Sequence, residues 1–379
     1  MWEFYKSDMV QTYLIKTFHG LEGVLSEELL SLGGKEIVQL NRAVSCKGNQ
    51  ELAYRINYEC RTALSVLLPI KSGRVSDEDE LYQFVYDIEW YHHFTLEKSF
   101  WIDVTCFSNR FRNTLYVAQK CKDAVADRFR SKYHKRPSAR KDSDLRINIY
   151  ISDDECVVSL DLTGRPLFHR GYRIFKGEAP INEVLACGLL KLSGWVPDTV
   201  LVDPMCGSGT FLIEAALLGL NRPCQQLRSS FALMHYLDYN RRLWESIKDE
   251  ADHEDRDIEL SLLGMDIDRQ MMRFARKNAM GIDLHMINWK SKDFFEWRPE
   301  EEAGCIIINP PYDERLSLED AIEFYRRMGD HLKQNCAGWQ AWIISSNLQA
   351  LKHIGLKTSK RIKVFNGPLE CRFVGIDLY

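Results

Sequence analysis

Residues 306–312 have the sequence Ile-Ile-Ile-Asn-Pro-Pro-Tyr, in which an apolar, strand-like run ends in an amide, two prolines and an aromatic ring. Proline lacks an amide hydrogen and restricts the backbone, so this segment presents carbonyl oxygens as acceptors. An exocyclic amino group of a nucleobase becomes nucleophilic when acceptors draw its hydrogens out of conjugation with the ring. The side-chain oxygen of Asn309 and the carbonyl oxygen of Pro310 can accept these hydrogens, and Tyr312 can stack on the base. We therefore expect Asn309, Pro310 and Tyr312 to be catalytic.

A loop with two glycines lies between a predicted strand at residues 199–203 and a predicted helix at 211–219. Glycine allows a tight turn and a close approach of a ligand to the backbone, and helix N-termini attract anions. The loop lacks the lysine of a nucleoside-triphosphate loop. An aspartate at the strand end is typical of loops that receive an amino-acid or sulfonium group, although the glycines alone also fit an ordinary strand-to-helix turn. The expected cofactor contacts here are Asp203, Pro204, Cys206, Gly207, Ser208, Gly209 and Thr210.

Acidic residues end the next two predicted segments. Asp266 follows a predicted strand at 260–265, where a carboxylate can accept hydrogen bonds from both ribose hydroxyls of an adenosine moiety. It lies 57 residues after Gly209 instead of the usual spacing of about 20, and a polar stretch at 221–259 accounts for the excess if it loops out of the sheet. Asp293 can bind the adenine amino group or cap the helix that follows it. We add Asp266, Asp293 and Asn309 to the expected cofactor contacts.

Strands and helices alternate from about residue 179 onward, which predicts an α/β domain with a parallel, doubly wound sheet and ligands at the carboxyl ends of its strands. Further strands are predicted at 305–308 and 339–345, and further helices at 182–193, 271–280 and 318–335. Residues 12–70 show the pattern strand, helix, strand, helix, with the last helix over 51–68. This pattern predicts a small α+β domain.

The segment 108–146 is strongly basic, with twelve cations against four acids. An apolar stripe that includes Leu115, Val117, Cys121 and Phe129 predicts a helix that turns its cations outward, where they suit phosphates, although a solvated helix face would look similar. The expected RNA-binding residues are Arg128, Arg130, Lys132, Lys135 and Arg136. A second cluster without acids, Lys352, Lys357, Lys360, Arg361 and Lys363, could form another phosphate-binding edge.

The composition is that of a globular chain, with 379 residues, 45% hydrophobic and 27% charged, and a formal net charge of −4. No apolar run reaches the roughly 18 residues of a membrane span, and the first residues lack the basic and apolar regions of a secretory signal. The 11 cysteines include no C-x-x-C pair and no zinc-ligand spacing. We therefore expect a cytoplasmic protein with reduced cysteines, no membrane contact and no metal.

The glycine loop, Asp266 and residues 309–312, in this order, resemble the S-adenosylmethionine-dependent amino methyltransferases. Residues 169–173, His-Arg-Gly-Tyr-Arg, and 179–183 are similar to the entry segment of the subgroup that carries an N-terminal THUMP RNA-binding domain. That subgroup includes the bacterial 23S rRNA guanine-N2 methyltransferases, which are often labelled N6-adenine-specific DNA methylases. The resemblance covers about residues 10–379 and departs at Asp313, where relatives commonly carry glycine.

This resemblance implies a Rossmann-like methyltransferase sheet preceded by small α+β ferredoxin-like and THUMP domains. The implied domains are 1–70 ferredoxin-like, 71–165 THUMP and 166–379 methyltransferase. The implied reaction moves a methyl group from S-adenosyl-L-methionine to an exocyclic amine in structured RNA, most closely guanine N2 of 23S rRNA, by direct displacement.

Three alternatives remain open: a DNA adenine-N6 methyltransferase, a tRNA guanine-N2 methyltransferase and a catalytically silent RNA-binding protein. The basic segment favours RNA over DNA, and the three intact cofactor elements argue against a silent protein.

Overall fold

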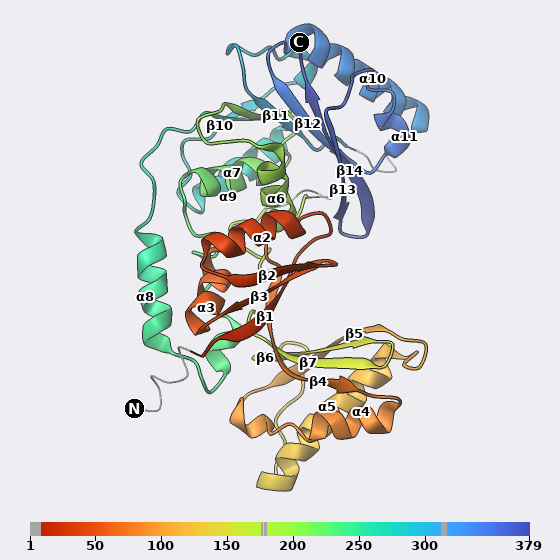
Figure 1. The fold of residues 1–379 in the computed structure, drawn as a ribbon. Coiled ribbons are helices and arrows are strands. Elements are labelled where there is room, and N and C mark those ends of the chain that lie inside the picture. Colours follow the sequence, from red (N-terminus) through yellow and green to blue (C-terminus); the bar gives the residue numbers. More distant parts are fainter. Residues whose placement is uncertain (1–8, 176, 178–179, 312–316) are drawn as a thin grey trace. The chain divides into compact units, whose positions relative to one another are not determined.

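The chain divides into two units whose segments alternate along the sequence (Figure 1). The structure is a computed structural model that describes residues 9–175, 177, 180–311 and 317–379. Unit 1 takes in the N-terminal segment up to Lys16, then Ser26–Leu167 and Arg228–Asp249. Unit 2 consists of Thr17–Leu25, Phe168–Leu227 and Glu250–Tyr379.

Unit 1 contains one seven-stranded sheet in the order β2-β3-β1-β4-β7-β6-β5. Its strands are β1 Gln11–Lys16, β2 Lys35–Leu40, β3 Ala43–Gly48, β4 Ser65–Arg74, β5 Phe100–Phe107, β6 Leu145–Ser152 and β7 Glu155–Asp161. Neighbours are antiparallel except β5 and β6. The long strand β4 pairs with β1 on one side and β7 on the other, so the two expected N-terminal domains share this sheet. The boundary proposed at residue 70 falls inside β4.

The helices of this part of the chain are α2 Glu22–Ser31, α3 Gln50–Glu59, α4 Glu78–Tyr86, α5 Thr114–Tyr133 and α8 Arg241–Asp252, with 3-10 turns at Trp90–His92 and Ala232–His235. The helix predicted over 51–68 is wrong beyond Glu59. The carboxylate of Glu28 accepts hydrogen bonds from the amides of Arg61 and Thr62, which takes the backbone out of the helix, and the rest of the run enters β4. A contact with a distant helix overrides local propensity here.

The apolar stripe of α5 is buried at Val117, Cys121 and Phe129, as predicted. Leu115 is an error in that prediction, because its side chain is 68% exposed. Residues two apart on a helix do not share a face, so Leu115 points away from the side on which Val117 lies.

The polar stretch between β8 and β9 loops out of its own sheet and contributes its central part to unit 1. The Tyr236 hydroxyl donates hydrogen bonds to the carbonyl oxygens of Arg146 and Asp161, each at 3.2 Å. Farther along, Trp244 is buried on α8, where its ring packs edge-on against those of Tyr54, Tyr58 and Phe231. The 228–249 segment is therefore part of the core of unit 1.

Unit 2 is a doubly wound α/β fold, which confirms the predicted fold class. Its sheet has the order β10-β9-β8-β11-β12-β14-β13, in which the first five strands are parallel and β14 is antiparallel to both neighbours. The strands are β8 Leu201–Asp203, β9 Leu262–Asp266, β10 Asn288–Ser291, β11 Cys305–Ile308, β12 Gln340–Ser345, β13 Lys360–Asn366 and β14 Leu369–Asp377. The helices are α6 Glu183–Ser193, α7 Thr210–Gly219, α9 Arg269–Met280, α10 Leu318–Asn335 and α11 Leu348–Leu351, with a 3-10 turn at Phe294–Glu296.

Two apolar cores lie on opposite faces of this sheet, one containing residues of α6, α7 and α9 and the other residues of α10 and α11. The strand order reverses between β8 and β11, where a crevice for a ligand opens at the carboxyl ends of strands. Within the described residues, no helix combines the length and apolarity that a membrane crossing needs. All 11 cysteines are free thiols.

Because Trp244 fills a site between three other rings, we predict that Trp244→Ala lowers the free energy of unfolding by about 3 to 5 kcal/mol, as large-to-small changes in cores do. Denaturant unfolding measured by fluorescence or circular dichroism tests this. Glu245→Ala, on the exposed side of α8, is the matched control and should change stability little. Equal stability of the two variants would show that the 228–249 segment does not support unit 1.

Candidate functional site

The glycine loop runs from the end of β8 at Asp203 to the start of α7 at Thr210. Gly209 caps α7 with φ of +88°, a left-handed conformation that favours glycine. A Cβ atom there would lie 2.7 Å from the Trp289 ring and 3.1 Å from the Cβ of Ala275. The loop therefore lies directly against neighbouring side chains, and the amides of the first turn of α7 lie at the crevice, where they favour an anionic ligand group.

Two buried or half-buried carboxylates flank this loop. Asp203 is fully buried, and burial, with a contribution from the charge of Asp266, raises its pKa well above the usual range. Asp266 ends β9, the neighbour of β8, and its two carboxylate oxygens accept hydrogen bonds from the amides of Gly207 and Asp268, each at 2.9 Å. Burial also raises the pKa of Asp266. Asp266 is thus fixed against the glycine loop despite their separation in sequence.

Asn309 follows β11 and lies with the glycine loop around one small pocket. The pocket is lined by Pro180, Ile181, Asp203, Met205, Cys206, Gly207, Ser208, Thr210, Phe211 and Asn309. The Oδ1 atom of Asn309 is buried, and no hydrogen-bond partner for it exists among the residues that the structure describes. A buried acceptor without a donor costs about 1 to 3 kcal/mol, so this oxygen is suited to receive a hydrogen from a bound molecule.

Three further residues were expected at this site: Pro310, Asp293 and Tyr312. Pro310 is buried directly after Asn309. Asp293 caps the 3-10 turn at Phe294–Glu296 by accepting a hydrogen bond from the Phe295 amide at 2.9 Å, so the capping role that the sequence allowed is present. Asp293 is not among the residues that line the pocket. Tyr312 and Asp313 lie outside the described residues.

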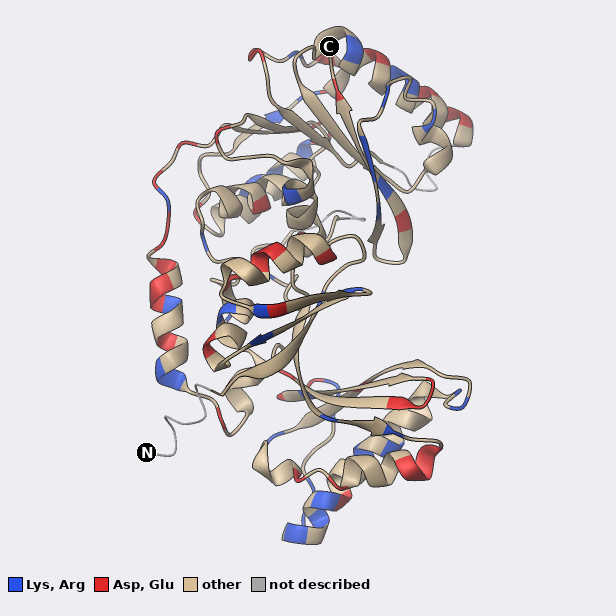
Figure 2. Ribbon diagram, in the orientation of Figure 1, with Lys and Arg blue, Asp and Glu red and all other residues tan. Residues whose placement is uncertain are grey.

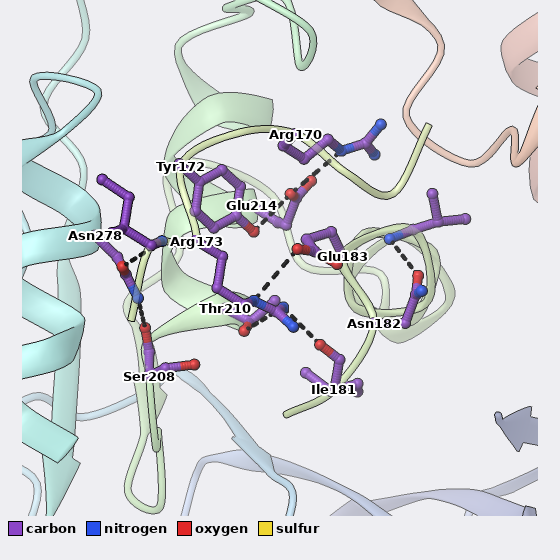
Figure 3. A network of polar contacts seen from close by, with 12 residues as sticks. Arg170, Tyr172, Arg173, Ile181, Asn182, Glu183, Ser208, Thr210, Glu214 and Asn278 are labelled. Carbon is purple, nitrogen blue, oxygen red and sulfur yellow. Dashed lines mark hydrogen bonds and ion pairs between the residues drawn. The ribbon is translucent and has the colours of Figure 1, made fainter. Parts of the chain in front are cut away.

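A polar network that the sequence did not assign joins residues 170–183 to the start of α7 (Figure 3). Glu214 is fully buried on α7, where Arg170 lies 3.5 Å from its carboxylate and the Tyr172 hydroxyl donates a hydrogen bond at 2.9 Å. Arg173 donates to the Thr210 hydroxyl at 2.9 Å. An acid among the apolar residues of 211–218 is the signal in the sequence that could have revealed this network.

Asn278, on α9, completes the network from the other side (Figure 3). Its side-chain amide donates to the carbonyl oxygens of Ser208 and Phe175, and its Oδ1 accepts from the amides of Ile174 and Phe175. Residues 173–175 are therefore bound to the glycine loop and its following helix and to α9, and they hold the loop in place.

The five expected RNA-binding residues of unit 1 differ in burial and in the side chains that they contact. Arg128 is half-buried, 3.6 Å from Glu89, and its guanidinium lies over the Tyr86 ring at 5.3 Å. The ammonium of Lys132 lies 3.3 Å from the centre of the Tyr91 ring.

Lys132 is exposed, and so are the other three cations. Arg130 pairs with Asp127 at 3.0 Å. Lys135 and Arg136 are exposed and form no ion pair with any described residue. These two are the cations most available to phosphates.

Three family models match consecutive parts of the chain. Residues 12–67 match an RlmL ferredoxin-like domain, residues 75–161 match a THUMP domain, and residues 170–374 match an RMKL-like methyltransferase domain. The last match alone covers more than half of the chain.

Named relatives show the same similarity. The chain is 35% identical over 377 residues to slr0064 of Synechocystis sp., a provisionally named RNA methyltransferase, with 98% of each chain covered. It is 38% identical to the ribosomal RNA large subunit methyltransferase K/L of Psychromonas ingrahamii, covering 95% of this chain but only 49% of that protein. The chain thus spans about half the length of the K/L relatives. A solved structure, the provisionally named methyltransferase SMU.472 in complex with SAH, matches with a TM-score of 0.87, 29% identity and 98% coverage of both chains.

The close approach of the loop at Gly209 yields a prediction. We expect Gly209→Ala to lose both stability and affinity for S-adenosylhomocysteine, because the added methyl group would collide with Trp289 and Ala275. For stability, Gly207→Ala is the matched control, since its Cβ would meet no protein atom within 4 Å and only the cost of a left-handed alanine, about 1 to 2 kcal/mol, applies. Denaturant unfolding and calorimetric titration measure both effects. If Gly209→Ala is as mild as Gly207→Ala, close packing does not constrain the loop.

Proposed function

The chain belongs to the family of RMKL-like methyltransferases, and we propose that it transfers a methyl group from S-adenosylmethionine to the exocyclic amino group of a base in structured RNA. We propose N2 of a guanine in 23S rRNA as the target. The ribosomal RNA large subunit methyltransferase K/L name of several relatives and the THUMP match support an RNA substrate. Such a substrate also supports a cytoplasmic location.

The observation that carries this proposal is the Oδ1 atom of Asn309, which lies beside the glycine loop and has no hydrogen-bond partner among the described residues. We propose that this oxygen and the carbonyl oxygen of Pro310 accept the two hydrogens of the target amine. The amine lone pair then leaves conjugation with the ring and can attack. When bound, S-adenosylmethionine would supply an activated methyl group on a sulfonium. The amine nitrogen would form the new N–C bond as the S–C bond breaks, the sulfur would leave as a neutral thioether, and the extra proton on nitrogen would pass to water. Tyr312 remains our proposed stacking partner for the base.

The proposed cofactor contacts lie around β8 and β9. The glycine loop and the first turn of α7 suit the amino-acid end of the cofactor, because free amides there can bind its carboxylate. Asp266 suits the ribose, since each of its oxygens retains a lone pair after accepting one backbone amide. The full proposed set is Asp203, Pro204, Cys206, Gly207, Ser208, Gly209, Thr210, Asp266 and Asp293, together with Asn309, whose contact contributes little to affinity because its amide acts on the target amine.

We keep the division into residues 1–70, 71–165 and 166–379 as a proposal, with RNA recognition assigned to the second part. Among its cations, Lys135 and Arg136 are the proposed phosphate contacts, while Arg128, Arg130 and Lys132 already interact with neighbouring side chains.

Nucleoside mass spectrometry on a deletion strain tests the target. The proposed function requires that N2-methylguanosine be lost from 23S rRNA and restored when the gene is returned. Loss of N2-methylguanosine from tRNA instead would show that tRNA is the substrate. Loss of N6-methyladenine from DNA would overturn the RNA assignment.

The role of Asn309 gives a catalytic prediction. Asn309→Ala should abolish methyl transfer while leaving S-adenosylmethionine affinity within about twofold, because the amide acts on the acceptor amine and not on the methyl donor. Asn288→Ala, an exposed change at the start of β10, should retain full activity. A tenfold loss of cofactor affinity in Asn309→Ala would instead make Asn309 a cofactor ligand.

The structure also refines the RNA-binding prediction. Lys135→Ala/Arg136→Ala should weaken RNA binding and reduce the slope of log affinity against log salt by about 1.4 to 1.8, because each neutralised phosphate contributes about 0.7 to 0.9. Arg241→Ala/Arg242→Ala on α8 removes the same charge from unit 1 and should leave the slope unchanged. If both pairs change the slope equally, the effect is one of general charge and Lys135 and Arg136 are not specific contacts.

A further inference from the structure

The segment 352–363 of unit 2 concentrates positive charge that the proposed site does not use. It carries five cations and no acid: Lys352, Lys357, Lys360, Arg361 and Lys363. All five are exposed. Lys363 pairs with Glu370, while the other four form no ion pair with any residue in the described part of the chain. Lys360, Arg361 and Lys363 lie on β13, the edge strand of the sheet, where Figure 2 shows positive charge, and Lys352 and Lys357 precede this strand.

The strand pairing shows that Lys363 of β13 lies at the same edge of the sheet as the candidate site. β14 is antiparallel to both β12 and β13, so β13 runs parallel to β12. Arg372 of β14 lies opposite Ser345, the last residue of β12, and opposite Lys363 of β13. Lys363 therefore lies at the carboxyl edge of the sheet, the edge at which Asn309 follows β11.

Side-chain alternation directs Arg361 and Lys363 to one face and Lys360 to the other, where its ammonium lies over the Trp342 ring at 5.9 Å. Ile362 and Val364 pack with the core that contains α6 and α7, so Arg361 and Lys363 point to the opposite face. Arg372 shares that face because it lies directly across from Lys363. The carboxylate of Glu370 contacts Lys363 at 2.6 Å and Arg372 at 2.8 Å and holds both side chains in place.

Arg361 keeps most of its hydrogen-bonding capacity. Its Nε donates to the Thr358 hydroxyl at 2.8 Å, which fixes the guanidinium, and its terminal amino groups have no partner among the residues described here. A fixed guanidinium with free donors can bind phosphate oxygens in a bidentate manner.

The dimensions match a polynucleotide backbone beside the pocket. Three strand spacings of about 4.8 Å separate β11 from β13, so the basic edge lies about 14 Å from Asn309. Arg361 and Lys363 are two residues apart on one strand, or about 6.7 Å. These spacings allow the edge to meet phosphates one to a few nucleotides away from a base in the pocket.

We propose that Arg361 and Lys363, supported by Lys352 and Lys357, bind the phosphates of the RNA strand next to the target base. This inference rests on the function proposed above. The edge thus positions the strand locally, separately from any RNA contact made by unit 1, and it draws the polyanion to the site despite the net charge of −4.

The test uses Lys357→Gln/Arg361→Gln, because neither residue forms an ion pair with a described residue and their removal leaves no carboxylate unpaired. Arg326→Gln/Lys333→Gln removes the same charge from exposed positions on α10 and serves as the control. Lys357→Arg/Arg361→Lys retains the charge. Each protein is measured for binding and methylation of protein-free ribosomal RNA from a deletion strain over a salt titration, and for S-adenosylmethionine affinity as a check of folding.

We expect the first variant to lower the salt slope by about 1.4, at about 0.7 per cation on a single strand, and to raise the KM for RNA with kcat and cofactor affinity unchanged. The control should match the parent, and the charge-retaining variant should keep the salt slope of the parent, because the slope counts charges. If the parent methylates RNA and the first variant equals it, or if the control loses as much, the basic edge does not bind substrate. If the parent methylates no RNA, the proposed function itself fails, and this inference fails with it.

Discussion

The buried carboxylate of Glu214 is the constraint around which the candidate site is organised. An ionised side chain in the middle of an apolar helix costs several kcal/mol unless charge and hydrogen bonds compensate it, and removing one partner of such a pair is costly. Arg170 and Tyr172 supply that compensation from the segment that enters unit 2. Once this segment is bound to α7, Arg173 reaches the Thr210 hydroxyl and residues 174 and 175 reach Asn278. The end of the glycine loop next to α7 is thus held, at Ser208 and Thr210, by residues that need not touch a ligand.

Some elements were predicted correctly from the sequence because their own residues mark them clearly. The apolar run at 305–308 coincides with β11, and the helix predicted over 318–335 coincides with α10, which Ser317 caps. The cap of α10 is local, whereas β11 pairs with distant strands and was predictable because a strand buried on both faces is a continuous apolar run. The glycine loop and Asn309 could be assigned to one site for a related reason, since carboxyl ends of neighbouring parallel strands must meet at one edge.

The errors arise where a distant residue decides the local conformation. Nothing between residues 59 and 65 predicts that the helix must stop, because the acceptor that captures those amides is Glu28. The polar composition of 221–259 likewise predicts that it leaves the sheet but not that Trp244 joins a cluster of rings in unit 1. The number of cations in the segment 108–146 also gives no information on their surroundings. It does not distinguish Arg128, which lies against Glu89 and Tyr86, from the exposed Lys135. Pattern identifies which side chains are suited to a role, and long-range contacts decide which of them are available.

The interleaving of the two units has a consequence for how the chain acquires its structure. Unit 1 lacks Tyr236 and Trp244 until the chain has been made through β8, the glycine loop and α7, so its core cannot be completed by an uninterrupted N-terminal stretch. Closing the connection between Leu167 and Arg228 costs little extra entropy, because loop-closure cost grows only with the logarithm of length. Residues 168–227, which make this connection, carry Glu214 and the glycine loop. The departure of the chain into unit 1 also separates β8 from β9 in the sequence, and therefore separates Asp203 from Asp266. Folding of unit 1 and alignment of the two cofactor-side strands therefore depend on the same stretch of chain, which accounts physically for the long spacing between Gly209 and Asp266.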